Sequence, residues 1–414
     1  MTTLTSKKFS VFCLALANAM VYSFNALFYC FLPLYFNDRF SPIEAGIVLS
    51  VGPAVSIVAP VFWGMLADRA KYKNTVLICT VLLSSIFFYS LKFDVGFLPM
   101  CVLVGVTMLF MSPFAGLIDT ITLEYTSEHA IPYGPIRVLG TLGFGVISLV
   151  SGFFTGTDID IIFYLYVGMA LLCALVLLGC PRVQGHARDA AAGNDAAAGN
   201  DAADGKKRGG LDLRPLLRAH RLWIIVGFML LCQFAYSYYC NFYPSYLRDV
   251  LGQPEWIWGL NVLILVCGEI PFFFLYNRLF AKVGIRALLT VSVVGSAVRY
   301  LLLGMTDSVA ALIAVNLLTG FLVTVVTYCG AMYITAYIAP GLQATGQNLM
   351  YCIGQGIARV FGGVLGGVIE SRFGTSGGMY LFGGLLTAAV VVCIFVVLRD
   401  PSPEWRQIRS AENR

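Results

Sequence analysis

Four charged residues lie within long apolar stretches and are the first candidates for chemistry: Asp119, Arg137, Glu269 and Arg299. A charged side chain in hydrocarbon is costly, so by default it marks a ligand site or a proton path. A guanidinium can form two parallel hydrogen bonds with a carboxylate or a pair of hydroxyls. A carboxylate in a low-dielectric cavity can bind a proton near neutral pH. These residue types therefore predict solute binding and proton transfer in an apolar environment.

The spacing of the four residues predicts two acid–arginine pairs. Asp119 and Arg137 each lie nine residues from a predicted turn near residue 128. At about 1.5 Å per residue, both sit about 13 Å along antiparallel helices. Glu269 and Arg299 lie 14 and 16 residues from a turn near residue 283. The alternative is that these are structural ion pairs, but desolvation makes buried pairs poor stabilisers, which favours a role with a ligand or a proton.

The elements that position these residues are apolar helices. The 414 residues are 58% hydrophobic and 12% charged, whereas soluble domains are about 25% charged. Runs of near 20 apolar residues are long enough to cross a bilayer of about 30 Å. Twelve such runs predict an all-α membrane protein: 9–36, 43–66, 75–93, 97–123, 131–155, 160–180, 222–247, 256–277, 286–305, 308–338, 341–369 and 378–398.

The chain divides into two similar halves. Segment 185–210 repeats AAAGND and has almost no apolar bulk, which predicts a flexible linker. Arg137-Val138-Leu139-Gly140 recurs as Arg359-Val360-Phe361-Gly362, 222 residues later. We expect two pseudo-symmetric six-helix bundles related by a parallel repeat. The predicted domains are 1–183 and 219–400, joined by a cytoplasmic linker, 184–218, and followed by a cytoplasmic tail, 401–414.

The basic residues indicate orientation. With the N-terminus inside, 20 of the 27 Lys and Arg lie in tails and cytoplasmic loops. Four lie in outer loops and three within helices: Arg39, Lys92, Arg248 and Arg372, then Arg137, Arg299 and Arg359. This bias places both termini in the cytoplasm, and we expect a multi-pass protein of the plasma (cell inner) membrane. The first run is too long for a signal-peptide core, so it is read as a retained helix.

Several other function classes lack their motifs. The sequence contains no H-E-x-x-H and no G-x-x-x-x-G-K-[ST], so we expect neither an enzyme nor an ATP-driven pump. The 12 cysteines form no C-x-x-C pair, so no metal site and no cofactor are expected. The basic residues follow topology, so no nucleic-acid partner is expected.

The segment GMLADRAKYKN, residues 64–74, resembles the signature loop of the major facilitator superfamily. The matching positions are Gly64, Asp68, Arg69, Lys71 and Lys73, although the usual glycine after the Asp-Arg pair is absent. The resemblance implies the major facilitator fold. It also implies that this is a gating loop, in which Asp68 and Arg69 stabilise one end state by pairing with the opposite half.

A closer resemblance is to the lactose-permease-like oligosaccharide:proton symporters and the related phenylpropionate permeases. Asp119, Arg137 and Phe144 fall on the acid, the sugar-binding arginine and the aromatic of that group, which has Glu and Trp at the first and third positions. Further family positions fall on Asn241, Glu269 and Arg299. The resemblance implies that these six residues bind the substrate.

The chain departs from these symporters in the proton relay. Asn316, Thr319 and Leu322 stand where the family has charged or titratable residues. If protons are coupled, Glu269 is the first candidate carrier and Asp119 the second.

The resemblance implies alternating-access symport of a small polar solute with a proton, the solute being a sugar, a nucleoside or an aromatic carboxylate. The alternatives are an uncoupled facilitator, an exporter of drugs or metabolites on the same fold, and, from another class, a membrane enzyme or receptor. We expect a monomer.

Overall fold

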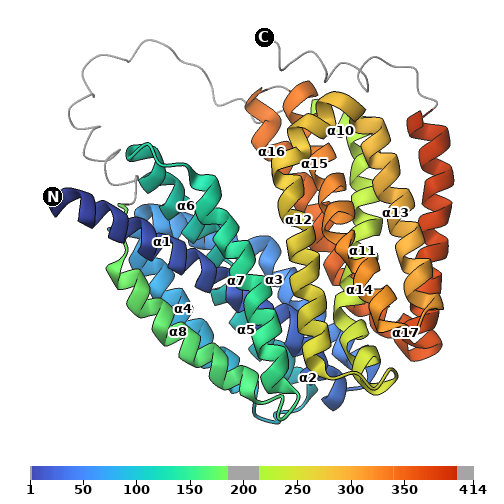
Figure 1. The fold of residues 1–414 in the computed structure, drawn as a ribbon, viewed down its shortest axis with the longest axis horizontal. Helices are drawn as coiled ribbons and strands as arrows, with labels where there is room; N and C mark the ends of the chain where they lie inside the picture. Colours follow the sequence, from blue (N-terminus) through green and yellow to red (C-terminus); the bar gives the residue numbers. More distant parts are fainter. Residues whose placement is uncertain (1, 185–213, 339, 399–414) are drawn as a thin grey trace. The chain divides into compact units, whose positions relative to one another are not determined.

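The computed structural model describes residues 2–184, 214–338 and 340–398 (Figure 1). These residues are almost entirely helical and form no strand, apart from one isolated bridge between Tyr72 and Gln184. The predicted linker at 185–210 and the tail at 401–414 lie outside the described residues.

The first half of the sequence forms eight α-helices and one π-helical turn. They are α1 Thr2–Ala26, η1 Leu27–Phe31, α2 Leu32–Arg39, α3 Pro42–Arg69, α4 Lys73–Ser90, α5 Phe97–Met111, α6 Phe114–Glu128, α7 Tyr133–Thr155 and α8 Ile161–Gly179. The turn predicted near residue 128 is confirmed, because α6 ends at Glu128 and α7 begins at Tyr133.

The described part of the second half is built in the same way. Its elements are α10 Arg214–Arg218, α11 His220–Asp249, α12 Glu255–Val283, α13 Ile285–Met305, α14 Val309–Leu317, α15 Thr319–Tyr337, α16 Pro340–Tyr351, η2 Cys352–Ile357, α17 Ala358–Cys393 and η3 Ile394–Leu398. The turn predicted near residue 283 is confirmed at Gly284, whose φ of 81° favours glycine.

Eleven segments among the described residues are long and apolar enough to cross a membrane. The last two predicted runs, 341–369 and 378–398, fall in one of them, Thr345–Val397. That segment is interrupted at Gly374, where φ 64° and ψ 176° are not helical. The predicted all-α membrane fold is confirmed, and the count of twelve crossings stays a prediction.

The helices pack into two compact units. Unit 1 comprises Met1–Asn25, Val55–Phe144 and Asp160–Leu213, and unit 2 comprises Ala26–Ala54, Gly145–Ile159 and Arg214–Arg414. The units group segments by packing, whereas the predicted domain boundaries follow the sequence repeat, so those boundaries stay a prediction.

Aromatic side chains form part of the core of unit 1. The rings of Phe88 and Tyr166 stack with centroids 4.0 Å apart, and Phe24 contacts both Tyr166 and Phe114. These contacts fix α1 against α4, α6 and α8. Buried Asn18 on α1 adds a hydrogen bond to Thr122 on α6, 2.8 Å long. The core thus holds α1 and α6 in the register on which the polar cluster of unit 1 depends.

Candidate functional site

The polar cluster of unit 1 consists of Asp119 on α6, Arg137 on α7 and Tyr22 on α1. Arg137 Nε lies 3.8 Å from Asp119 Oδ1, so the predicted pair is present. The Tyr22 hydroxyl donates a hydrogen bond to Asp119 Oδ2, 2.8 Å long. The guanidinium carbon of Arg137 lies 3.9 Å from the centroid of the Tyr22 ring, a cation–π contact. The tyrosine therefore supports both charges at once.

The Asp119–Arg137 pair is open rather than closed. Its 3.8 Å separation exceeds hydrogen-bond length, and Asp119 Oδ1 has no hydrogen-bond partner among the described residues. Arg137 donates one hydrogen bond, from a terminal nitrogen to Thr141 Oγ1 at 3.0 Å. The side chains of Arg137 and Asp119 are 34% and 28% exposed. The pair retains unused donors and an unused acceptor, which is the arrangement that can bind hydroxyl groups or a carboxylate.

Close packing of α7 against α1 brings Arg137 over the tyrosine. A Cβ atom on Gly140 would lie 2.6 Å from a Tyr22 ring carbon, and one on Gly143 would lie 2.5 Å from the Ala19 carbonyl oxygen. Only glycine permits this approach. Phe144 follows Arg137 by seven residues, about two turns, so it lies on the same side of α7.

In unit 2, the structure gives Glu269 and Arg299 different partners. Glu269 Oε1 accepts a 2.6 Å hydrogen bond from the Thr324 hydroxyl on α15. Arg299 donates a 2.9 Å hydrogen bond to Asn316 Oδ1 on α14. The predicted pairing of these two residues is wrong for the structure as described. Matched depth did not bring them together, because Arg299 turns toward α11 and α14, whereas Glu269 faces α15.

The environment of Arg299 is aromatic. The side chain is 3% exposed. Its guanidinium carbon lies 4.4 Å from the ring centroid of Tyr239 and 4.7 Å from that of Tyr300. Asn316 provides a neutral hydrogen-bond acceptor. Arg299 is thus held by π faces and an amide instead of a carboxylate.

Glu269 is positioned by a close crossing of α12 and α15. A Cβ atom on Gly320 would lie 2.7 Å from the Leu265 carbonyl oxygen and 2.9 Å from Glu269 Cβ. The absence of a side chain at Gly320 lets the two helices approach, and Thr324, one turn further along α15, then reaches the carboxylate.

The predicted gating loop joins α3 to α4 in unit 1. Gly64 lies in the last part of α3, and Asp68, Arg69 and Lys71 are exposed. Lys73, by contrast, is 2% exposed, and its ammonium contacts Glu124 on α6 and lies 3.7 Å from Asp68. Within its own unit, this lysine therefore ties the loop to α6. Pairing of Asp68 and Arg69 with the opposite half stays a prediction.

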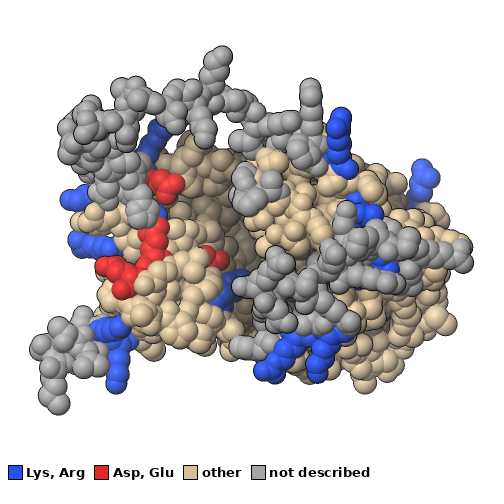
Figure 2. Space-filling model, turned by 90° about the horizontal axis from the view of Figure 1, so that it is seen from above, with Lys and Arg blue, Asp and Glu red and all other residues tan. Residues whose placement is uncertain are grey.

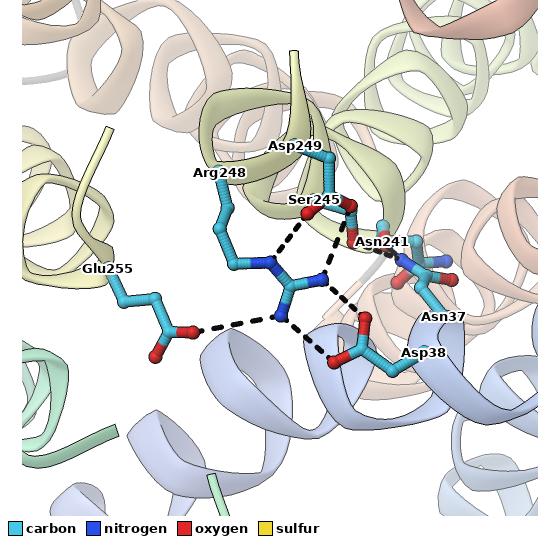
Figure 3. Close-up of polar contacts among 7 residues, drawn as sticks. All are labelled: Asn37, Asp38, Asn241, Ser245, Arg248, Asp249 and Glu255. Carbon is cyan, nitrogen blue, oxygen red and sulfur yellow. Dashed lines mark hydrogen bonds and ion pairs between the residues drawn. The ribbon is translucent and has the colours of Figure 1, made fainter. Parts of the chain in front are cut away.

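Another polar cluster joins the end of α11, the start of α12 and α2 in unit 2 (Figure 3). This cluster was not predicted from the sequence. Arg248 on α11 donates to both carboxylate oxygens of Asp38 on α2, one at 2.9 Å. It also donates to Asp249 at 2.7 Å and lies 3.7 Å from Glu255. Asn37 on α2 donates to the Asn241 carbonyl oxygen at 2.8 Å. We call these residues the Arg248 cluster, and it fastens α2 to α11 and α12.

One of the predicted substrate-binding residues lies beside the Arg248 cluster. Asn241, predicted to bind the substrate, is half-buried and receives its hydrogen bond through the backbone beside the Arg248 cluster. The one sequence signal for this cluster was the outer-loop arginine Arg248. Its partner Asp38 lies 210 residues earlier, so no residue spacing reveals the pair. Among the described residues, no group of three or more His, Cys, Asp or Glu could hold a metal ion.

The sequence of this chain matches a known protein family. The sequence pattern of the MFS_1 like family matches residues 13–382. The chain belongs to the MFS_1 like family. It is 25% identical over 381 residues to the maltose permease of Geobacillus stearothermophilus, covering 91% of this chain and 92% of the permease. It is 26% identical over 243 residues to a probable 3-phenylpropionic acid transporter of Escherichia coli (strain K12), covering 57% of this chain and 58% of that protein.

The fold agrees with membership in the MFS_1 like family. The chain resembles the crystal structure of the nucleoside transporter NupG with a TM-score of 0.79 at 16% identity, covering 94% of this chain and 99% of that chain. The protein is therefore an integral, multi-pass membrane protein of the major facilitator type. It is a secondary transporter of a small-molecule solute and not an enzyme.

Proposed function

We propose that this transporter moves a small polar solute, namely a sugar, a nucleoside or an aromatic carboxylate, together with a proton by alternating access. The observation that carries the proposal is the open pair of Asp119 and Arg137 on the Tyr22 ring. A structural ion pair would satisfy its own hydrogen bonds, whereas this pair leaves donors and an acceptor for a ligand. Phe144, on the same side of α7, supplies an aromatic face for a ring.

Relatives of this chain favour the same substrate classes. One is named for maltose and another for 3-phenylpropionic acid. A bidentate arginine suits both, because paired hydroxyls and a carboxylate present two oxygens at similar separation. We propose that Asn241, Glu269 and Arg299 also contact the solute during its passage.

For proton coupling, we propose Glu269 as the carrier. Its carboxylate is half-buried and accepts a hydrogen bond from Thr324, so protonation and deprotonation change a local contact. Asp119 is the second candidate, although the neighbouring arginine favours its charged form. An uncoupled facilitator is supported by one observation: Asn316 replaces a charged position of the relay and binds Arg299 as a neutral amide.

We propose a monomer in the plasma membrane with both termini in the cytoplasm. The positive-inside bias supports this orientation. Figure 2 shows Lys and Arg side chains at several places on the face seen from above. With that orientation, the Arg248 cluster lies at the outer end of unit 2, where we propose that it stabilises an outward-closed state.

The test is uptake of labelled maltose, uridine and 3-phenylpropionate by cells that express the protein. Arg137→Ala should abolish uptake of every solute that the wild type accumulates, with unchanged amounts of protein in the membrane. Arg372→Ala is the matched control, because Arg372 is an exposed arginine of α17. Undiminished uptake by Arg137→Ala would refute the assignment of Arg137 to the solute-binding site.

A further inference from the structure

Two arginines within the apolar helices of unit 2 lack a carboxylate partner among the described residues. Arg299 on α13 contacts Asn316, Tyr239 and Tyr300. Arg359 on α17 is half-buried and contacts the ring of Tyr29 at 5.6 Å. A guanidinium in an apolar setting is costly without a counter-charge. In unit 1, Asp119 provides a counter-charge for Arg137, whereas the described part of unit 2 places no carboxylate beside Arg299 or Arg359.

Arg359 occupies the position that the sequence repeat equates with Arg137. Both arginines begin the same Arg-Val-x-Gly pattern, 222 residues apart. Both also lie over a tyrosine of the first membrane segment, Tyr22 for Arg137 and Tyr29 for Arg359. The repeat therefore conserves the arginine and its aromatic support but not the acid. The proposed transport function gives no role to Arg359, whose guanidinium lacks a carboxylate partner among the described residues.

The two arginines act on one stretch of α11. The guanidinium carbon of Arg299 lies 4.4 Å from the ring centroid of Tyr239, and the backbone carbonyl oxygen of Arg359 accepts a 3.3 Å hydrogen bond from Ser237, two residues earlier on α11. Tyr236 and Tyr239 have their ring centroids 6.4 Å apart. Arg299 Nε is buried and has no hydrogen-bond partner among the described residues. This stretch of α11 thus adjoins two arginines, a buried donor without a partner among the described residues, and the aromatic rings of Tyr236 and Tyr239.

We propose that the transported solute is an organic anion whose carboxylate is bound by Arg359 with the support of Arg299. This inference rests on the proposed transport function and narrows its substrate class. A carboxylate supplies the counter-charge that Arg299 and Arg359 lack among the described residues, and it is planar, so a guanidinium fork can bind it through two hydrogen bonds. The aromatic surfaces of Tyr236 and Tyr239 favour a carboxylate attached to a flat or apolar body. Arg359 is then the residue that selects anions over neutral solutes.

The experiment compares an acid with its neutral analogue on the purified full-length protein. The probes are 3-phenylpropionate and 3-phenylpropionamide, which share one skeleton, with inorganic phosphate and maltose as further arms. Binding is measured as the ligand-induced rise in melting temperature over a concentration series. The variants are Arg359→Gln, which removes the charge, Arg359→Lys, which keeps it, and Arg372→Gln, an exposed arginine of the same helix.

Wild-type protein should bind the acid at least tenfold more tightly than the amide. Arg359→Gln should lose ten- to a hundredfold in affinity for the acid, as expected for one charged hydrogen-bond pair, and remain unchanged toward the amide. Arg359→Lys should retain part of the preference, and Arg372→Gln all of it. The melting temperature without ligand reports whether each variant is folded.

Three results would overturn the inference: equal affinity for acid and amide, binding of maltose alone, or an acid preference that Arg359→Gln leaves intact. A response to phosphate equal to that for the acid would also overturn it, because it would show a generic anion site in place of a carboxylate site. The proposed transport function fails separately, when Arg137→Ala leaves uptake unchanged. If Arg137→Ala loses uptake but the wild type binds the acid and the amide equally, the transport function stands and only the assignment of a carboxylate to Arg359 is refuted.

Discussion

The Arg248 cluster gives the sharpest prediction about alternating access, through the substitution Asp38→Asn. Arg248 contacts Asp249 on its own helix, and that pair can persist whether or not α2 separates from α11. The contact with Asp38 joins two helices and must break when they separate. Asp38→Asn should therefore shift the equilibrium away from the outward-closed state, while the fold of each helix is preserved.

The size of the shift follows from geometry and exposure. Arg248 donates two hydrogen bonds to the Asp38 carboxylate, but the side chains are 26% and 37% exposed, so solvent screens the pair. Exposed ion pairs contribute up to about 1 kcal/mol. A change of about 1 kcal/mol corresponds to roughly a fivefold change in the open population. Arg248→Gln should have an effect at least as large, because it leaves Asp38 and Glu255 without their shared cation.

Hydrogen exchange of the purified protein measures this population. Where opening is rapid, the exchange rate of protected amides follows the open fraction, so peptides covering residues 32–39 and 245–256 should exchange up to fivefold faster in Asp38→Asn. Asp94→Asn, an exposed acid of unit 1, is the matched control. Unchanged protection in Asp38→Asn, or an equal rise in the control, would refute the reasoning. A double-mutant cycle with Arg248→Gln isolates the pair.

Three further predictions concern single residues. Lys73→Met should destabilise unit 1 by about 3 kcal/mol, because it leaves the Glu124 carboxylate without its buried cation, and thermal unfolding measures the loss. Asn316→Leu should cost about 2 kcal/mol, since it removes the amide oxygen that accepts a hydrogen bond from the buried Arg299, and the same unfolding experiment checks it. Glu269→Gln should abolish uphill uptake driven by a proton gradient but preserve solute exchange in proteoliposomes; retained uphill uptake would exclude Glu269 as the proton carrier.

The features that depend on residues near one another in the chain could be predicted from the sequence. Apolar runs predicted the helices, and their ends placed the turns near residues 128 and 283. Asp119 and Arg137 lie equally far from a short turn, so counting residues placed them together. The same counting failed for Glu269 and Arg299, because depth does not determine which neighbour a helix face meets. Glu269 faces α15 through the glycine contact at Gly320, which no spacing within α12 and α13 reveals.

Contacts between distant segments could not be predicted in this way. Asp38 and Arg248 are 210 residues apart, and each alone reads as an ordinary charge at a helix end. Tyr22 was also missed, although it lies four residues from Asn18 on the first helix. Its role depends on how closely α7 approaches α1, which the glycines at 140 and 143 permit. Helix-to-helix distance is a tertiary property, and one sequence contains little information about it.

The most direct test of the central claim is ligand binding at Arg137. Wild type and Arg137→Gln would be purified and their melting temperatures measured with maltose, uridine and 3-phenylpropionate. The account predicts that at least one of these solutes stabilises the wild type and that this rise disappears in Arg137→Gln, whose melting temperature without ligand stays near that of the wild type. An equal rise in both proteins would contradict the claim that Arg137, with Asp119 and Tyr22, binds the transported solute.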